Sequence, residues 1–242
     1  STSRGLGDVY KRQDVKRLEE EGRLVSVAGG VAKPARLSLD ATHRVKLGIR
    51  PREKAAIARR AAELIRPGDL LYLDAGTTML ALARLLAARP AAERVDVVTN
   101  DLAVAAAVGE HPGAQIHVLG GRLDAGNLST DGPTAAAELA GFNIDLAFIS
   151  ASSFDLRGLS VPTEGKAIVK RSIAEHADRC VLVADSSKYG RVSTFKALPL
   201  RAFDAIVTDP ALPDAVRDRA TAVGVDLLLT PLPDPSHVGE HP

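Results

Sequence analysis

Apolar runs of strand length alternate with segments of helical spacing from residue 51 to residue 230. The predicted strands cover residues 69–74, 95–99, 115–119, 144–150, 180–184, 205–208 and 226–229. A helix is expected over residues 51–66, and others begin near residues 77, 101, 133, 164 and 210. Short, branched runs such as Val95-Asp96-Val97-Val98 are typical of strands buried on both faces. The pattern therefore predicts an α/β fold, a Rossmann-like and mostly parallel sheet with helices on both faces.

The first fifty residues have a different character. A short charged helix is predicted over residues 14–22, and a strand over residues 23–27 that turns at Gly29-Gly30. A helix followed by a hairpin is typical of the end of a winged helix. We therefore expect four regions: a winged-helix remnant (1–32, of which 1–11 have the composition of an artefactual end), a linker (33–50), the main domain (51–230) and a disordered tail (231–242).

The most informative segment is Asp74-Ala75-Gly76-Thr77-Thr78, where an apolar strand runs into a small, hydroxyl-bearing turn that opens a helix. The first N–H groups of a helix are unpaired and carry the positive end of its dipole. An anion at Thr77 and Thr78 would satisfy both, and Asp74 can accept from a sugar hydroxyl. The alternative is an ordinary helix cap, since threonine often caps helices and glycine often forms turns.

Polar residues also follow other predicted strands, in Thr99-Asn100-Asp101, Gly120-Gly121, Ser150-Ala151-Ser152-Ser153 and Asp185-Ser186-Ser187-Lys188. Ligands of open α/β sheets bind outside the carboxyl ends of the strands. We therefore expect these turns to form one pocket, in which Lys188 supplies a positive charge for a phosphate.

Charge and composition exclude several classes of protein. Among 242 residues, 31 Lys and Arg oppose 30 Asp and Glu, so no global field favours nucleic acid or a membrane. No apolar stretch is long enough to span a membrane, and we expect a cytoplasmic protein. The single cysteine, Cys180, lies in an apolar strand pattern, which predicts a buried thiol and excludes an internal disulfide or a cysteine-based metal cluster.

Signatures of common enzymes and cofactor sites are absent from the sequence. There is no Gly-x-Gly-x-x-Gly or Gly-x-Ser-x-Gly motif, and Gly165-Lys166 is followed by Ala167 where a nucleotide-binding loop needs a hydroxyl. Of the six histidines, the one close pair, His237 and His241, lies in the tail that is expected to be disordered, so a metal site has little support. We therefore expect no cofactor and no metal.

Several motifs, taken in their order and spacing, resemble the DeoR family of bacterial transcriptional regulators over residues 12–230. They are Leu18-Glu19-Glu20-Glu21-Gly22, Gly29-Gly30, Lys54-Ala55-Ala56-Ile57-Ala58, Asp74-Ala75-Gly76-Thr77-Thr78, Val98-Thr99-Asn100-Asp101-Leu102, Leu119-Gly120-Gly121, Gly158-Leu159-Ser160, Glu164 and Ala184-Asp185-Ser186-Ser187-Lys188-Tyr189. The resemblance implies a winged helix-turn-helix and a sensor domain shaped like ribose-5-phosphate isomerase and glucosamine-phosphate deaminase. It also implies a phosphorylated sugar as effector, operator DNA as partner and a homo-oligomer.

The resemblance assigns roles to positions of this chain. Gly76, Thr77 and Thr78 would hold the phosphate, Asp74 and Asn100 would face the sugar, Glu164 and Lys188 would line the same pocket, and Lys170 is a weaker candidate. For Lys170 and Arg171 the alternative is a solvated helix face. Ser150 replaces a glycine common in the family, and Lys166 an acidic residue, which bears on the identity of the effector.

The DNA-binding part departs further from the family pattern, which needs about forty more residues before Arg12. Arg12, Lys16 and Arg17 would then be the remnant of a recognition helix that contacts phosphates and base edges. We expect weak or absent operator binding by this chain as given.

Two other functions are compatible with the same scaffold. One is a sugar-phosphate isomerase or deaminase with a carboxylate base at Asp74, Asp145 or Glu164. The other is an oligomeric scaffold that binds no effector.

Overall fold

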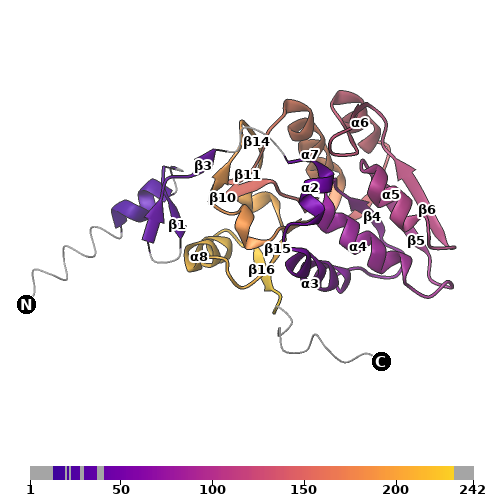
Figure 1. Ribbon diagram of the computed structural model, residues 1–242, viewed down its shortest axis with the longest axis horizontal. Helices are drawn as coiled ribbons and strands as arrows, with labels where there is room; N and C mark the ends of the chain where they lie inside the picture. Colours follow the sequence, from indigo (N-terminus) through magenta and orange to yellow (C-terminus); the bar gives the residue numbers. More distant parts are fainter. Residues whose placement is uncertain (1–12, 20, 22, 28–29, 37–40, 232–242) are drawn as a thin grey trace, which may run out of the picture.

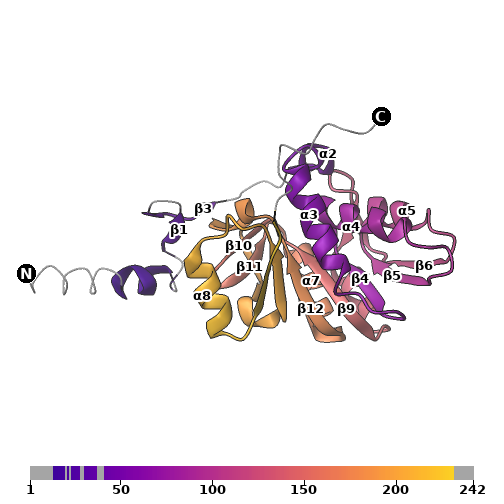
Figure 2. The same cartoon turned by 90° about the horizontal axis from the view of Figure 1, so that it is seen from below.

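The computed structural model describes residues 13–19, 21, 23–27, 30–36 and 41–231. Its centre is a seven-stranded sheet in the order β16-β15-β12-β9-β4-β5-β6, and every neighbouring pair in it is parallel (Figures 1 and 2). The strands are β4 (Leu70–Leu73), β5 (Val95–Thr99), β6 (Ala114–Val118), β9 (Ile144–Ser150), β12 (Ala177–Val183), β15 (Ala205–Thr208) and β16 (Asp226–Leu229). All seven sheet strands lie where the apolar pattern predicts them, and the predicted α/β fold is confirmed.

The two faces of the sheet carry separate hydrophobic cores, as strand β9 illustrates. Leu146 and Phe148 pack in one core, whereas Ala147 and Ile149 pack in the other. Successive side chains of a strand point to opposite faces, so a strand covered on both sides must be apolar at every position. This is why the strands read as continuous apolar runs in the sequence.

Three helices cover each face. The cores assign α3 (Pro51–Ala62), α4 (Thr77–Ala87) and α5 (Leu102–Val108) to one face, and α6 (Pro133–Leu139), α7 (Glu164–His176) and α8 (Asp214–Ala222) to the other. Pro51 occupies the first turn of α3, where a missing N–H costs nothing. Because α4 directly follows β4 in the chain and α5 directly follows β5, the turns that enter these helices lie at the carboxyl ends of the two strands.

Short antiparallel pairs, which the sequence pattern did not predict, complete the main domain. Strands β10 (Ser153–Asp155), β11 (Gly158–Val161) and β14 (Phe195–Pro199) form a small sheet, and β7 (Arg122–Asp124) pairs with β8 (Ser129–Asp131). Strands of three to five residues are too short to show a clear hydrophobic period.

The N-terminal residues form the expected helix and hairpin, with a helix over residues 13–19 and strands β1 (Val25–Val27) and β2 (Gly30–Ala32). They lie at one end of the molecule, beside α8 and the small sheet and far from β6 (Figure 1). Val25 is 3% exposed, belongs to one of the two cores, and would be 3.2 Å from a Cβ placed on Gly190. The hairpin therefore packs against the main domain.

The segment expected to be a linker contains regular structure. Strand β3 (Ala35–Arg36) pairs in parallel with β13 (Arg191–Val192), and α2 (His43–Leu47) precedes α3. Each element is too short for a hydrophobic period, and its partners lie far away in the sequence, so the pattern alone indicated a linker. Residues 1–11, Arg12 and residues 232–242 of the expected tail lie outside the described residues.

Candidate functional site

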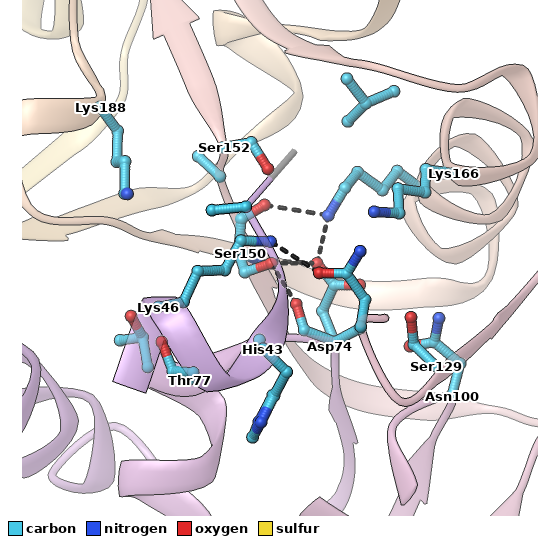
Figure 3. A pocket seen from close by; sticks show the side chains of 18 of the residues that line it. His43, Lys46, Asp74, Thr77, Asn100, Ser129, Ser150, Ser152, Lys166 and Lys188 are labelled. Atoms are coloured by element: carbon cyan, nitrogen blue, oxygen red, sulfur yellow. Dashed lines mark hydrogen bonds and ion pairs between the residues drawn. The ribbon is translucent and has the colours of Figure 1, made fainter. Parts of the chain in front are cut away.

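A cavity of about 170 Å³ opens where β4, β5 and β9 end. The turns after β4 and β9 line it, together with α2, α7 and the segment around Lys188 (Figure 3). These elements come from distant parts of the chain and meet because parallel strands end at the same edge of the sheet. The predicted pocket is therefore present at this edge, with residues from each of the predicted turns except Gly120-Gly121, which does not line it.

The turn between β4 and α4 forms one wall of the cavity. Gly76 has φ 145° and ψ 163°, a backbone conformation that side chains with a Cβ rarely adopt. Thr77 and Thr78 follow as the first residues of the 11-residue helix α4. Within the described chain, nothing accepts a hydrogen bond from the backbone N–H or the hydroxyl of either threonine. The wall therefore presents unpaired donors at the positive end of a helix dipole.

The carboxylate of Asp101 fixes this turn from behind. It accepts hydrogen bonds from Ala103 N at 2.8 Å and Val104 N at 3.0 Å, which cap α5, and from Gly76 N at 3.0 Å. Burial raises the pKa of Asp101, and the backbone donors of Val104, Gly76 and Ala103 oppose that rise. One carboxylate thus connects the start of α5 to the turn that precedes α4.

Asp74 and Lys170 form a buried ion pair at the centre of the cavity. Asp74 Oδ2 also accepts hydrogen bonds from Ser150 N at 2.9 Å and from Ser150 Oγ at 2.8 Å, and Lys170 Nζ donates to Ser150 O at 2.9 Å (Figure 3). Asp74 is 3% and Lys170 7% exposed. No residue of the described chain donates to Asp74 Oδ1. This oxygen can therefore accept from a sugar hydroxyl while its partner oxygen holds the wall together.

Asn100 lines the same wall, but its amide is occupied by the protein. Its Oδ1 accepts from Tyr72 OH at 3.0 Å, and its Nδ2 donates to Thr130 O at 2.8 Å. Burial raises the pKa of Tyr72 well above its usual value, so the phenol stays protonated and remains the donor. Asn100 consequently supports the shape of the wall more than it offers free hydrogen-bonding groups.

Positive charge dominates the cavity. The basic residues that line it are Lys46, Lys54, Lys166, Lys170, Lys188 and Arg191, whereas Asp74 is the one carboxylate among the described lining residues. Lys170 is neutralised by Asp74, and Lys166 Nζ lies 3.8 Å from Asp124 Oδ2. The remaining positive charge therefore lies around Lys54 and Lys188, where Asp185 and Glu53 compensate part of it.

Lys54 lies in this part of the cavity. Its side chain is 5% exposed, and its Nζ donates to the backbone oxygen of Lys46. Burial lowers the pKa of Lys54 and the nearby charges of Lys188 and Lys46 lower it further, whereas the carboxylates of Asp185 and Glu53 oppose this shift. An anion bound beside these three lysines would relieve their mutual repulsion.

The comparisons with known proteins identify the family. The DeoR C-terminal sensor domain family matches residues 49–210. The chain belongs to the DeoR family. The HTH-type transcriptional regulator YgbI of Escherichia coli K12 is 43% identical over 218 residues, which cover 90% of this chain and 84% of that protein. The HTH-type transcriptional repressor GlcR of Bacillus subtilis 168 is 31% identical over 221 residues, covering 90% and 83%.

Solved structures similar to this DeoR-family chain share low identity with it. Ribose 5-phosphate isomerase A from Methanocaldococcus jannaschii has a TM-score of 0.40 and 18% identity, with 56% of this chain and 53% of that chain covered. Translation initiation factor eIF-2B from Pyrococcus horikoshii OT3 has a TM-score of 0.46 and 15% identity, with 64% and 62% covered.

The relatives bear names of transcriptional regulators and repressors, not of enzymes. This DeoR-family chain is therefore a transcriptional regulator, and the isomerase or deaminase alternative is not supported. Within the described ranges, no helix is long and apolar enough to cross a membrane. The same part of the chain holds no group of three metal-ligating residues, and Cys180 is buried as predicted.

Most positions that the resemblance to the DeoR family singled out meet in the cavity. The lining residues include Asp74, Gly76, Thr77, Thr78, Asn100, Lys170 and Lys188. Lys170 is the informative case, because the sequence also allowed a solvated helix face and the structure instead buries it against Asp74. Contact of these residues with an effector stays a prediction.

Glu164 does not line the cavity, so that expectation is corrected. It is the exposed first residue of α7, whereas Lys166, Val169 and Lys170 of the same helix do line the cavity. Residues of a helix are 100° apart around its axis, which places Glu164 opposite the other three. Its position near the pocket in the sequence did not determine its face.

Sequence reasoning missed other lining residues, namely His43, Lys46, Lys54, Asn127, Ser129 and Arg191. Lys54 belongs to a family motif, but a lysine in the first turn of a helix gives no signal of burial. Lys46 and His43 lie in the segment that was expected to be a linker, and Arg191 in a two-residue strand.

Lys16 and Arg17 lie on the exposed face of the N-terminal helix, and Arg17 pairs with Asp14 and Glu21 at 3.8 Å. Exposed basic residues are compatible with DNA contact but also with a solvated helix. Their DNA-binding role stays a prediction.

Proposed function

We propose that this DeoR-family regulator controls genes of carbohydrate metabolism by binding a phosphorylated sugar in the cavity, which changes its affinity for operator DNA. The observation that carries the proposal is the coincidence of unpaired N–H groups at Thr77 and Thr78 with the neighbouring lysines Lys54 and Lys188 in the wall of one cavity. Both features stabilise an anion, and a phosphate group is the anion that helix N-termini commonly bind.

The remainder of the cavity supports a sugar as the other part of the ligand. Asp74 Oδ1 and the hydroxyl of Ser129 offer hydrogen-bonding groups of the kind that sugar hydroxyls use. The mechanism would be linkage, since the effector must bind the weak-DNA and strong-DNA states with different affinity. Each tenfold preference is worth about 1.4 kcal/mol.

The proposal is tested by calorimetry on matched ligands, each a sugar phosphate and its unphosphorylated parent sugar, chosen by a thermal-shift screen that includes ribose 5-phosphate and glucosamine 6-phosphate. Thr77→Val or Lys188→Ala removes one donor to the phosphate and should weaken the sugar phosphate about 10- to 100-fold, as expected for a charge-assisted hydrogen bond. The parent sugar should lose much less.

Lys196→Ala is the matched control, because Lys196 is an exposed lysine that does not line the cavity. It should leave both affinities unchanged. Equal losses for the two ligands in Thr77→Val and Lys188→Ala would remove the phosphate assignment.

A further inference from the structure

The segment that joins the N-terminal region, residues 13–36, to the sensor domain forms part of the cavity wall. Residues 41–50, which we call the strap, contain α2, and Ala41, His43, Lys46 and Ile49 of the strap line the cavity. In Figure 2, α2 lies at one end of α3 and α4, and Figure 3 shows Lys46 and Thr77 approaching the cavity from different elements. The strap is therefore both a connection and a wall.

Polar contacts hold the strap in place. His43 N donates to Gly126 O at 2.8 Å, Lys46 Nζ donates to Asn127 Oδ1 at 2.9 Å, and Lys54 Nζ donates to the backbone oxygen of Lys46. By contrast, its apolar side chains pack poorly, with Val45, Leu47 and Ile49 being 56%, 39% and 40% exposed. A five-residue helix that buries little apolar surface has low local stability.

The strap also brings groups that an anion would stabilise. Lys46 lies close enough to Lys54 to lower its pKa, so its charge adds to that of Lys54 and Lys188. His43 is 7% exposed, and its Nε2 is buried without a hydrogen-bond partner in the described chain. The strap thus carries one of the lysines that line the cavity and a buried polar atom without a hydrogen-bond partner in the described chain.

A second attachment of the N-terminal region lies beside the same cavity. Strand β3 pairs with β13, whose Arg191 lines the cavity, and Val25 of the hairpin packs against the adjoining Gly190. Among the described residues, this second attachment therefore adjoins the cavity through Arg191.

We propose that the strap is part of the effector site: Lys46 binds the anionic group of the effector, and this contact fixes the strap over the cavity. The inference rests on the proposed function and adds to it the element that reports occupancy. Binding the anion from both α4 and α2 joins the sensor domain to the segment that leads to the N-terminal region. A bound effector thereby restricts the orientation of that region.

The test uses inorganic phosphate as the probe and the full chain as the protein. Hydrogen–deuterium exchange of the wild type should slow across residues 41–50 when phosphate is added. Lys46→Gln should weaken phosphate about tenfold or more, as the loss of a charge-assisted hydrogen bond predicts. Lys46→Arg, which keeps the charge, should restore most of the affinity.

Arg44→Gln is the matched control, since Arg44 is an exposed cation of the same five-residue helix and does not line the cavity. If phosphate binds and Thr77→Val weakens it, but Lys46→Gln equals Arg44→Gln and residues 41–50 show no protection, the strap proposal is wrong and the proposed function stands. If the wild type binds neither phosphate nor any sugar phosphate, the proposed function fails and the strap proposal with it.

Discussion

Individual charged residues in this protein behave according to what surrounds them, as Lys170 and Lys54 show. Lys170 is buried with Asp74 as a partner, so its charge is compensated. Lys54 is also buried but lies near Lys188 and Lys46, and burial together with their repulsion lowers its pKa despite the opposing charges of Asp185 and Glu53. Burial also raises the pKa of Cys180 to about 12, so the thiol is unreactive at neutral pH.

Lys54 makes anion binding dependent on pH. A bound phosphate raises the lowered pKa of Lys54, so binding takes up protons at pH values between the pKa of the free and the bound state. Affinity for a phosphorylated sugar should therefore fall as pH rises through this window. Calorimetry over a series of alkaline pH values, all above the phosphate's own pKa near 6, in buffers of different ionisation enthalpy measures the uptake.

Lys54→Arg is the control for this prediction, because a guanidinium stays charged throughout the accessible range. The variant should bind without proton uptake. Equal proton uptake by wild type and variant would assign the titration to another group.

At the scale of elements, the junction between β4 and α4 determines the geometry of the cavity wall that we propose to bind phosphate. The turn is fixed by Gly76, whose N–H donates to Asp101 and whose φ of 145° is unsuited to other residues. A Cβ at this position would also lie 3.4 Å from Ser150 Oγ. Strand, turn and helix therefore depend on one residue without a side chain.

Gly76→Ala should lower the free energy of unfolding by about 1–3 kcal/mol because alanine would be held in a strained conformation. It should also weaken phosphate binding, since the N–H groups that follow would shift. Urea denaturation measures the first effect and calorimetry the second.

Gly48→Ala provides the comparison. Gly48 has φ −77° and no atom nearer than 3.9 Å to an added Cβ, so alanine should be neutral or stabilise by up to about 1 kcal/mol. Similar losses in both variants would show that the conformation of Gly76 is not the cause.

At the scale of the whole molecule, the cavity lies where the sensor domain, the strap and the 186–192 segment meet. An effector bound in this cavity should stabilise the fold, because a ligand that binds only the folded state shifts the equilibrium towards it. Homo-oligomerisation and operator binding by this chain stay predictions.

A sugar phosphate present at 100 times its Kd should add about 2.7 kcal/mol to the free energy of unfolding. For a chain of this size that corresponds to a rise in Tm of about 5–10 °C. Differential scanning calorimetry measures the shift, and Thr77→Val at the same ligand concentration should show a smaller one. If no phosphorylated sugar raises Tm, the alternative of a scaffold without an effector gains support.

The sequence by itself determined the sheet and the core of the site. The seven sheet strands follow from continuous apolar runs. The turn that forms one wall of the cavity follows from a strand that ends before Asp74, Gly76, Thr77 and Thr78. These features are local, because hydrophobic period, turn residues and helix starts are written in neighbouring positions.

Only the tertiary structure decided which side chains outside the turn between β4 and α4 line the cavity. Lys46 and Arg191 belong to elements too short to show a period, Lys54 is buried by contacts made far along the chain, and Glu164 lies on the opposite face of α7 from Lys170. Contacts between distant segments depend on how the layers pack, and local spacing does not encode that packing.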